Sequence, residues 1–130
     1  MSKDHMYHFN MMLPVVTRNL TCFTSDELNT IADFIINIGD VQKRKTNVKA
    51  PMSDWYLHTE NPLVARLCDE AINVVKSFHG KSFNPPEFYT RKCWGAVYGK
   101  GDFTAPHHHS PNVYSWCFWR NQFWSNSNYN

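Results

Sequence analysis

The sequence contains no closely spaced pair of cysteines. Its four cysteines lie far apart, at Cys22, Cys68, Cys93 and Cys117. Without a Cys-x-x-Cys pair, neither a zinc knuckle nor a thioredoxin-like redox motif is supported. Four separate thiols are typical of a chain that stays reduced, so the simplest expectation is a cytoplasmic protein.

Long apolar runs and a strong net charge are also missing. The opening residues, Met1 to His5, are not followed by an apolar segment, so we expect neither a secretory signal nor a membrane span. The 13 Lys and Arg residues nearly balance the 11 Asp and Glu residues. The one dense basic run, Lys43-Arg44-Lys45, is weak support for a nucleic-acid surface, and a solvated loop explains it more simply. We therefore predict neither a nucleic-acid nor a membrane partner.

No Gly- or Ser-rich linker and no internal repeat divides the chain. Its 130 residues are within the usual length of one domain, and 42% of them are apolar and 15% aromatic. This composition excludes a disordered chain. We predict a single domain that covers residues 1–130, with a packed fold rich in Trp and Tyr.

Two segments have the pattern of amphipathic helices. The first begins after Thr24, which forms a capping-box pattern with Glu27, and ends at Gly39. The second begins at Asn61-Pro62, an N-cap followed by proline at the first helical position, and ends at Gly80. Apolar residues recur at helical spacing in both, at Leu28, Ile31, Ile35 and Ile38 and then at Leu63, Leu67, Ala71, Val74 and Phe78.

The last third of the chain favours β-structure, because aromatic and β-branched residues dominate it and a turn signal, Gly99 to Asp102, interrupts it. Residues 40–53 are polar and predict a surface loop. Helices followed by strands predict an α+β fold, with two N-terminal helices packed on an antiparallel sheet. Extended segments are expected at residues 54–58, 88–98, 103–109 and 114–119.

Three consecutive histidines, His107, His108 and His109, are the strongest chemical signal. Side chains alternate along a β-strand, so His107 and His109 are expected on one side and His108 on the other. Two imidazoles on one side can bind one metal ion at about 2.0–2.1 Å. A solvated histidine cluster fits the same spacing, so both interpretations stay open.

A third ligand is not evident next to this pair. After His109 the sequence contains no His, Asp or Glu, so a third protein ligand must come from upstream. A non-haem iron site would use two histidines and a carboxylate. A structural zinc site would use the pair with a cysteine such as Cys93 or Cys117. The upstream candidates are Asp102, His58, His79 and Asp54, although ordinary structural roles explain the two histidines more simply.

The stretch from Trp94 to Ser115 resembles a family of iron(II)- and 2-oxoglutarate-dependent oxygenases that is frequent in bacteria and bacteriophages. That family has a Trp, a few apolar residues, a Lys-Gly-Asp-aromatic turn, a His-x-His-Pro segment and a strand similar to Ser-Gly-Val-Tyr-Tyr. Here Trp116 stands in place of the strand glycine, and Ser110-Pro111 follows where the family has proline directly. With generic upstream motifs, the resemblance covers roughly residues 13–119. The matching residues are Trp94, Lys100-Gly101-Asp102-Phe103, His107, His109 and Ser115.

The resemblance implies a fold and a chemistry. The fold would be a double-stranded β-helix, a jelly-roll-like barrel, with helical support at about residues 13–80 and a β-helix core at about 86–119. His107 and His109 would bind Fe(II), and 2-oxoglutarate would be the cosubstrate in the hydroxylation of a small molecule or a protein side chain. An Arg would bind the 2-oxoglutarate carboxylate through its planar fork, and Arg120 is the only candidate downstream. No catalytic residue is assigned beyond the metal ligands.

The distal His and the later strands of that family are not found after Ser115, so the β-helix is expected to be partial and shortened. A partial barrel exposes strand edges and an apolar face, which a homo-oligomer would cover. Two functions therefore stay open. One is a 2-oxoglutarate- and Fe(II)-dependent dioxygenase, in the host cytoplasm if phage-encoded. The other is a non-catalytic remnant or a small metal-binding or interaction module.

Overall fold

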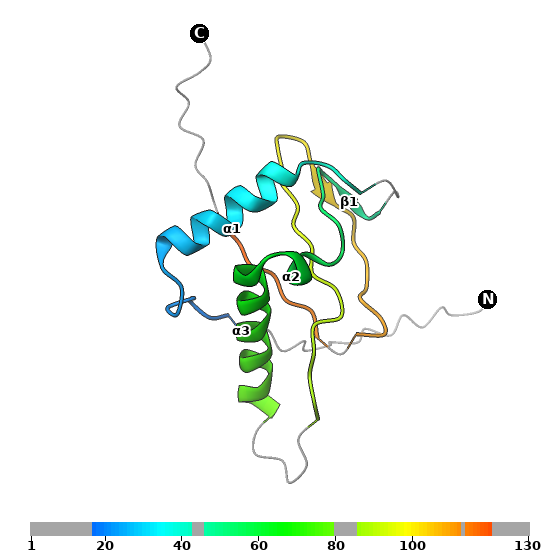
Figure 1. The fold of residues 1–130 in the computed structure, drawn as a ribbon. Helices are drawn as coiled ribbons and strands as arrows, with labels where there is room; N and C mark the ends of the chain where they lie inside the picture. Colours follow the sequence, from blue (N-terminus) through cyan, green and yellow to red (C-terminus); the bar gives the residue numbers. More distant parts are fainter. Residues whose placement is uncertain (1–16, 43–45, 80–85, 113, 121–130) are drawn as a thin grey trace, which may run out of the picture.

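The computed structural model describes residues 17–42, 46–79, 86–112 and 114–120. Within them the chain forms three helices and a two-stranded antiparallel sheet (Figure 1). None of the described helices is both long and apolar enough to cross a membrane. In chain order the elements are α1 (Ser25–Ile38), β1 (Val48–Lys49), α2 (Leu57–Glu60), α3 (Pro62–His79) and β2 (Phe103–Thr104).

The first helix, α1, is confirmed with its predicted ends. The Thr24 hydroxyl accepts a hydrogen bond from the Glu27 N–H at 3.1 Å, and the Glu27 carboxylate accepts one from the Thr24 N–H at 2.9 Å. This capping box satisfies two N–H groups that have no partner within the helix. The helix ends at Gly39, whose φ of 72° is in the region that favours glycine. Ile31, on its apolar face, is fully buried.

The second predicted helix is also confirmed, as α3. The Asn61 side-chain oxygen accepts hydrogen bonds from the N–H groups of Leu63 at 2.9 Å and Val64 at 3.2 Å, which is the expected N-cap arrangement. Val64, Leu67 and Cys68 are buried in the core. The predicted stop signal at residue 80 lies outside the described residues.

The prediction that residues 40–53 form a surface loop is wrong at the C-terminal end of that range. Met52 and Ser53 are only 2% and 1% exposed, and two residues of the loop form strand β1. The Ser53 hydroxyl donates to the Asp54 carbonyl at 2.8 Å and accepts from the Gly95 N–H at 2.9 Å. Because both its donor and its acceptor are used, this polar side chain can be buried at little cost.

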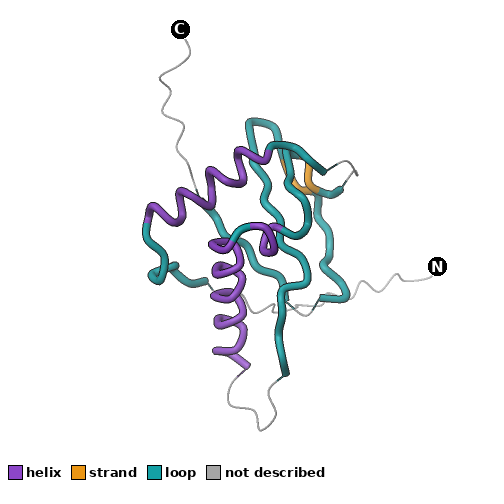
Figure 2. The backbone as a smooth tube through the Cα atoms, viewed as in Figure 1, coloured by secondary structure: helices purple, strands orange, loops and turns teal. Residues whose placement is uncertain are grey.

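An irregular backbone ladder joins the two halves of the chain. The Ser53 N–H donates to the Gly95 carbonyl at 3.0 Å, and the Cys93 N–H donates to the Trp55 carbonyl at 2.9 Å. The Leu57 N–H in turn donates to the Cys93 carbonyl at 3.1 Å. These bonds hold the segment before α2 against residues 93–97, which run mostly as loop beside the helices (teal in Figure 2).

This ladder packs on α1 at a glycine. A Cβ atom built on Gly95 would lie 2.5 Å from Ile35 Cγ2 and 2.9 Å from Ile35 Cγ1, well inside van der Waals contact. Only a residue without a side chain allows this close approach of loop and helix. The core that it closes consists of Phe23, Ile31, Leu57, Val64, Leu67, Cys68 and Cys93.

Regular β-structure is shorter than the sequence predicts. Within residues 103–109 only β2 is a strand, and it pairs with β1 through Val48–Thr104 and Lys49–Phe103. Residues 114–119 contain no strand, and α2 begins within the predicted extended segment 54–58, so those predictions are wrong. The described residues show helices with a small antiparallel sheet, while the double-stranded β-helix stays a prediction.

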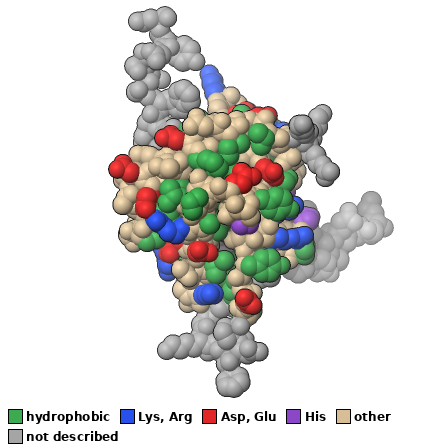
Figure 3. Space-filling view, in the orientation of Figure 1, with side chains coloured by type: hydrophobic (Ala, Val, Ile, Leu, Met, Phe, Trp, Pro, Cys, Tyr) green, Lys and Arg blue, Asp and Glu red, His purple; other side chains and the backbone are tan. Residues whose placement is uncertain are grey.

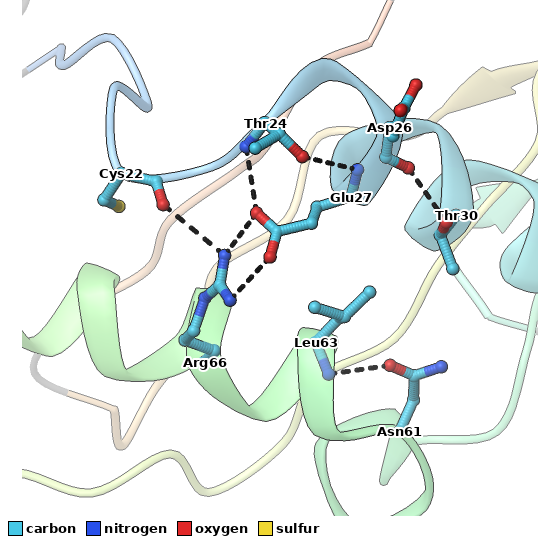
Figure 4. A network of polar contacts seen from close by, with 8 residues as sticks. All are labelled: Cys22, Thr24, Asp26, Glu27, Thr30, Asn61, Leu63 and Arg66. Carbon is cyan, nitrogen blue, oxygen red and sulfur yellow. Dashed lines mark hydrogen bonds and ion pairs between the residues drawn. The ribbon is translucent and has the colours of Figure 1, made fainter.

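Arg66 of α3 forms an ion pair with Glu27 in the first turn of α1 (Figure 4). Its guanidinium donates to both carboxylate oxygens of Glu27, at 2.8 and 2.6 Å, and lies 4.1 Å from the centre of the Phe23 ring. The Arg66 hydrogen bonds, together with the Thr24 N–H, lower the pKa of Glu27 to about 2. The carboxylate therefore stabilises the fold most when it is charged.

We expect this ion pair to make the fold sensitive to acid. Because the folded-state pKa of Glu27 is depressed, its contribution is complete above about pH 4.5 and is lost as the pH falls toward 2. Glu27→Gln keeps a capping amide but removes the charge, so it should lower the urea midpoint at pH 7 and have little effect near pH 2. The exposed Glu87, replaced by Gln, is the control. An equal loss from Glu27→Gln at both pH values would contradict this role of the charge.

Candidate metal-binding site

A tight turn carries the chain into the histidine segment. The Asp102 N–H donates to the Gly99 carbonyl at 3.2 Å, and the Asp102 carboxylate accepts from the Gly99 N–H at 2.8 Å. Gly101 has a φ of 88°, which a residue with a side chain rarely adopts. The turn predicted at residues 99–102 is confirmed, and it engages the carboxylate of Asp102.

The histidine segment is held at both of its ends. Just before it, the Ala105 N–H donates to the Asn47 carbonyl at 2.8 Å, which extends the pairing of β1 with β2. Just after it, the Asn112 N–H donates to the His109 carbonyl at 2.8 Å and closes a second turn. Backbone hydrogen bonds thus fix where the histidines lie.

The structure brings His107 and His109 together and turns His108 elsewhere. The Nε2 atoms of His107 and His109 are 3.0 Å apart, and their ring centres are 4.6 Å apart. His108 instead accepts a long hydrogen bond, 3.4 Å, from the Ser110 N–H through its Nδ1. The pair therefore lies together as side-chain alternation predicts, although these residues follow β2 rather than belonging to it.

The distance between the two Nε2 atoms fits two ligands of one ion. Nitrogens at about 2.0–2.1 Å from a metal are roughly 2.9 Å apart at a right angle and about 3.4 Å apart at a tetrahedral angle. A hydrogen bond between the rings explains 3.0 Å equally well, with one Nε2–H as donor. In either case the two nitrogens lie close enough to bind one ion.

The Ala105 carbonyl selects the tautomer of His107. It lies 2.8 Å from His107 Nδ1, and a carbonyl only accepts, so this nitrogen carries the proton. The Nε2 of neutral His107 then holds a lone pair directed at His109. Metal-binding histidines commonly donate their second N–H to a backbone carbonyl in this way.

The imidazole of His109 packs against aromatic rings. Trp94 stacks on its imidazole with centres 5.9 Å apart and planes inclined by 27°, and Trp55 meets Trp94 edge-on at 5.0 Å. The Lys92 ammonium lies 4.9 Å from the centre of the Trp55 ring. Burial lowers the pKa of His109, and the neighbouring His107 and His108 lower it further. The neutral, metal-binding form of His109 is therefore favoured.

The candidates for a third ligand do not join the pair. Among the described residues, no group of three His, Cys, Asp or Glu side chains is placed to hold a metal ion. Cys93 is buried against Cys68, and the hydrogen bond between the thiols, with burial, raises the pKa of Cys93. His58 is partly buried, with its Nδ1 buried and without a hydrogen-bond partner, near the ring of Tyr56.

The other predicted residues lie as follows. Arg120, the candidate for the 2-oxoglutarate carboxylate, donates to the Asn29 side chain on α1. The Asp54 carboxylate accepts from the Trp55 N–H. Cys117 is exposed and unbonded to another cysteine. The side chain of His79 lies outside what the structure describes.

Sequence reasoning missed two parts of the site. Trp94 was noted as a motif residue, but its stacking on His109 depends on a loop path that no local pattern predicts. The Ala105 carbonyl is a backbone group, so no residue type marks it. A proline at the next position, which cannot donate to a strand ladder, is the only local sign that the strand pairing ends there.

Comparison with other proteins does not place the chain in a family. No protein-family model, no curated protein and no solved structure matches it significantly.

Proposed function

We propose that the chain binds a divalent metal ion through the Nε2 atoms of His107 and His109, and that the ion serves 2-oxoglutarate- and Fe(II)-dependent dioxygenase chemistry. The 3.0 Å separation of these two atoms is the observation that supports the proposal most. The resemblance of the Trp94–Ser115 stretch to that family supports the choice of Fe(II) and 2-oxoglutarate.

The residues present suit two positions of such an ion. The His107 Nδ1–H is engaged by the Ala105 carbonyl, which leaves its Nε2 available. The Trp94 ring orients the imidazole of His109 and shields one face of it from water. Bound Fe(II), with 2-oxoglutarate as cosubstrate and O2 as the oxidant, would supply the chemistry that hydroxylates a C–H bond.

In this function the protein would position the two histidine ligands and leave the solvent side of the ion open for the cosubstrate. His107 is exposed and His109 is partly exposed, so a cosubstrate can approach the ion from the solvent side. The carboxylate-binding role proposed for Arg120 needs a change in its present contact with Asn29. Substrate is expected to be a small molecule or a protein side chain.

A second candidate function is a metal-binding or interaction module without turnover. It is favoured by one observation: the described residues supply two ligands, whereas an iron site of this class uses two histidines and a carboxylate. The same geometry at the pair supports this reading, but no oxidation chemistry follows from it. The structural zinc alternative with Cys93 or Cys117 is less favoured, because neither thiol lies at the pair.

Metal titration combined with a turnover assay separates these functions. The untagged chain is titrated anaerobically with Fe(II) in a calorimeter, then supplied with 2-oxoglutarate, ascorbate and oxygen, and succinate is measured. Metal binding with succinate formation above that of a His107→Ala/His109→Ala double variant is the expected result. Binding without succinate would leave only the non-catalytic module. A chain that does not bind metal would overturn the dioxygenase and the metal-binding module and would leave only an interaction module.

A further inference from the structure

The histidine pair is a half-site that faces outward. One chain offers two imidazole nitrogens, while zinc-like ions take four ligands in protein sites. His107 is exposed, as are Pro106 before it and Ser110 after it. Among the described residues no third ligand lies at the pair, so we take the remaining ligands of a bound ion from the solvent side, either from water or from another molecule.

The chain segment that carries the pair has no acidic or basic side chain of its own apart from its histidines, and the nearby charge that the structure shows is the Lys92 ammonium on Trp55. From Phe103 to Trp119 the sequence has no Lys, Arg, Asp or Glu. Its residues there are apolar or neutral polar, apart from the three histidines. Two copies that meet along this segment bring no like charges of the segment itself together. On the face shown in Figure 3, acidic and basic side chains are interspersed with apolar ones.

The same stretch also exposes large aromatic side chains. Phe103 is 56% exposed and Trp119 78% exposed, and Tyr114 and Trp116 also reach the surface. Side chains of this size are typical of surfaces that a partner covers when they form one continuous patch. An uncharged, aromatic stretch with an incomplete ligand set in its middle favours a second copy over a charged partner.

We propose that two copies of this chain share one zinc-like ion, each contributing His107 and His109, so that four imidazoles complete the site. The inference rests on the proposed metal binding by the same pair and not on the dioxygenase chemistry, because four imidazoles leave no position for a cosubstrate. A twofold axis through the ion would present the same pair from both chains, which is the arrangement of the commonest homodimers. Four neutral nitrogen ligands also match what zinc accepts.

A shared ion predicts a dependence of the dimer fraction on metal concentration that binding of one ion by one chain does not predict. Below half an equivalent of ion, each ion recruits two chains, so the dimer fraction rises with added metal. Above one equivalent, every chain can hold an ion of its own, so the dimer should dissociate again. A dimer that forms and then disappears with increasing metal is the signature of a shared ion.

Sedimentation velocity and calorimetry with Zn(II) alone test the proposal. The untagged full chain is expected to sediment at 15.3 kDa with EDTA and at twice that mass with half an equivalent of Zn(II), and calorimetry should give one ion per two chains. The dimer should weaken by at least a hundredfold on adding EDTA. His108→Ala should behave as the unmodified chain, and His107→Ala/His109→Ala should stay monomeric.

The outcomes distinguish the inference from the function on which it rests. One ion per chain with no change of mass would overturn the shared site but leave metal binding by the pair intact. No binding of Zn(II) or Fe(II) would overturn both. A dimer that forms equally in EDTA, or in the double variant, would show that other contacts hold the copies together and would overturn the proposal.

Discussion

His107→Ala and His109→Ala are each expected to weaken metal binding by more than about 100-fold, whereas His108→Ala should leave it nearly unchanged. Loss of a group that only orients a metal ligand costs about 10- to 100-fold in affinity, so loss of one of two ligands should cost more. His107 and His109 place their Nε2 atoms 3.0 Å apart, and His108 is turned toward the Ser110 N–H. Calorimetric titration with Zn(II) or Fe(II) measures the difference.

These substitutions should not unfold the chain. His107 and His108 are exposed, and His109 loses mainly its stacking on Trp94. Thermal unfolding followed by circular dichroism should give melting temperatures within a few degrees of each other for the three variants. His108→Ala is a matched control, because it removes an imidazole from the same segment. Equal losses of affinity in all three variants would show that the ion is bound by a loose cluster rather than by the pair.

Gly95→Ala is expected to be the most damaging single methyl addition, at about 2–3 kcal/mol of unfolding free energy. Its Cβ would lie within 2.5–3.0 Å of three Ile35 side-chain atoms. The backbone at this position cannot easily move away, because Ser53 holds it from both sides: the Gly95 N–H donates to the Ser53 hydroxyl and the Gly95 carbonyl accepts from the Ser53 N–H. Urea unfolding measures the loss.

A matched control and a rescue make this prediction specific. At Gly99 a new Cβ would meet only the Asp102 carboxylate, at the ordinary distance of 3.5 Å, so Gly99→Ala should cost little. Shortening the opposing side chain, Ile35→Ala, should recover part of the stability in the Gly95→Ala background. If Ile35→Ala and Gly95→Ala instead add their separate costs, the two residues are not in steric conflict.

The two long helices could be predicted because their signals are local. Thr24 and Glu27 close a capping box three residues apart, and Asn61 caps the helix that begins at the next residue. Each signal depends on a few neighbours in the chain, so no knowledge of the remaining fold is needed. The turn at residues 99–102 follows from the same kind of local chemistry.

The ladder between the two halves could not be predicted. Ser53 is a small polar residue in a polar stretch, and only its partner Gly95, 42 residues away, explains why it is buried. The composition of the aromatic run 114–119 predicts a strand, but a strand also needs a neighbouring strand at hydrogen-bonding distance. Residue type alone does not supply that partner.

The candidate site could be predicted only in part from the sequence. The pairing of His107 with His109 follows from their spacing, and the structure brings their Nε2 atoms together. The carbonyl that selects the tautomer and the Trp94 ring under His109 come from the three-dimensional path of the chain. Local patterns thus predicted that the two imidazoles lie together and left out what orients them.

The outward-facing pair has a consequence for the choice of ion. One chain, whose described residues fix only two neighbouring ligands, imposes little coordination geometry, so it cannot discriminate strongly among first-row metals by shape. Affinity should then rise from Mn(II) through Fe(II) and Ni(II) to Cu(II), as it does for simple nitrogen ligands, and the same calorimetric titrations would reveal that order. The ion that occupies His107 and His109 in a cell would be set by which metals are available there, and not by the protein alone.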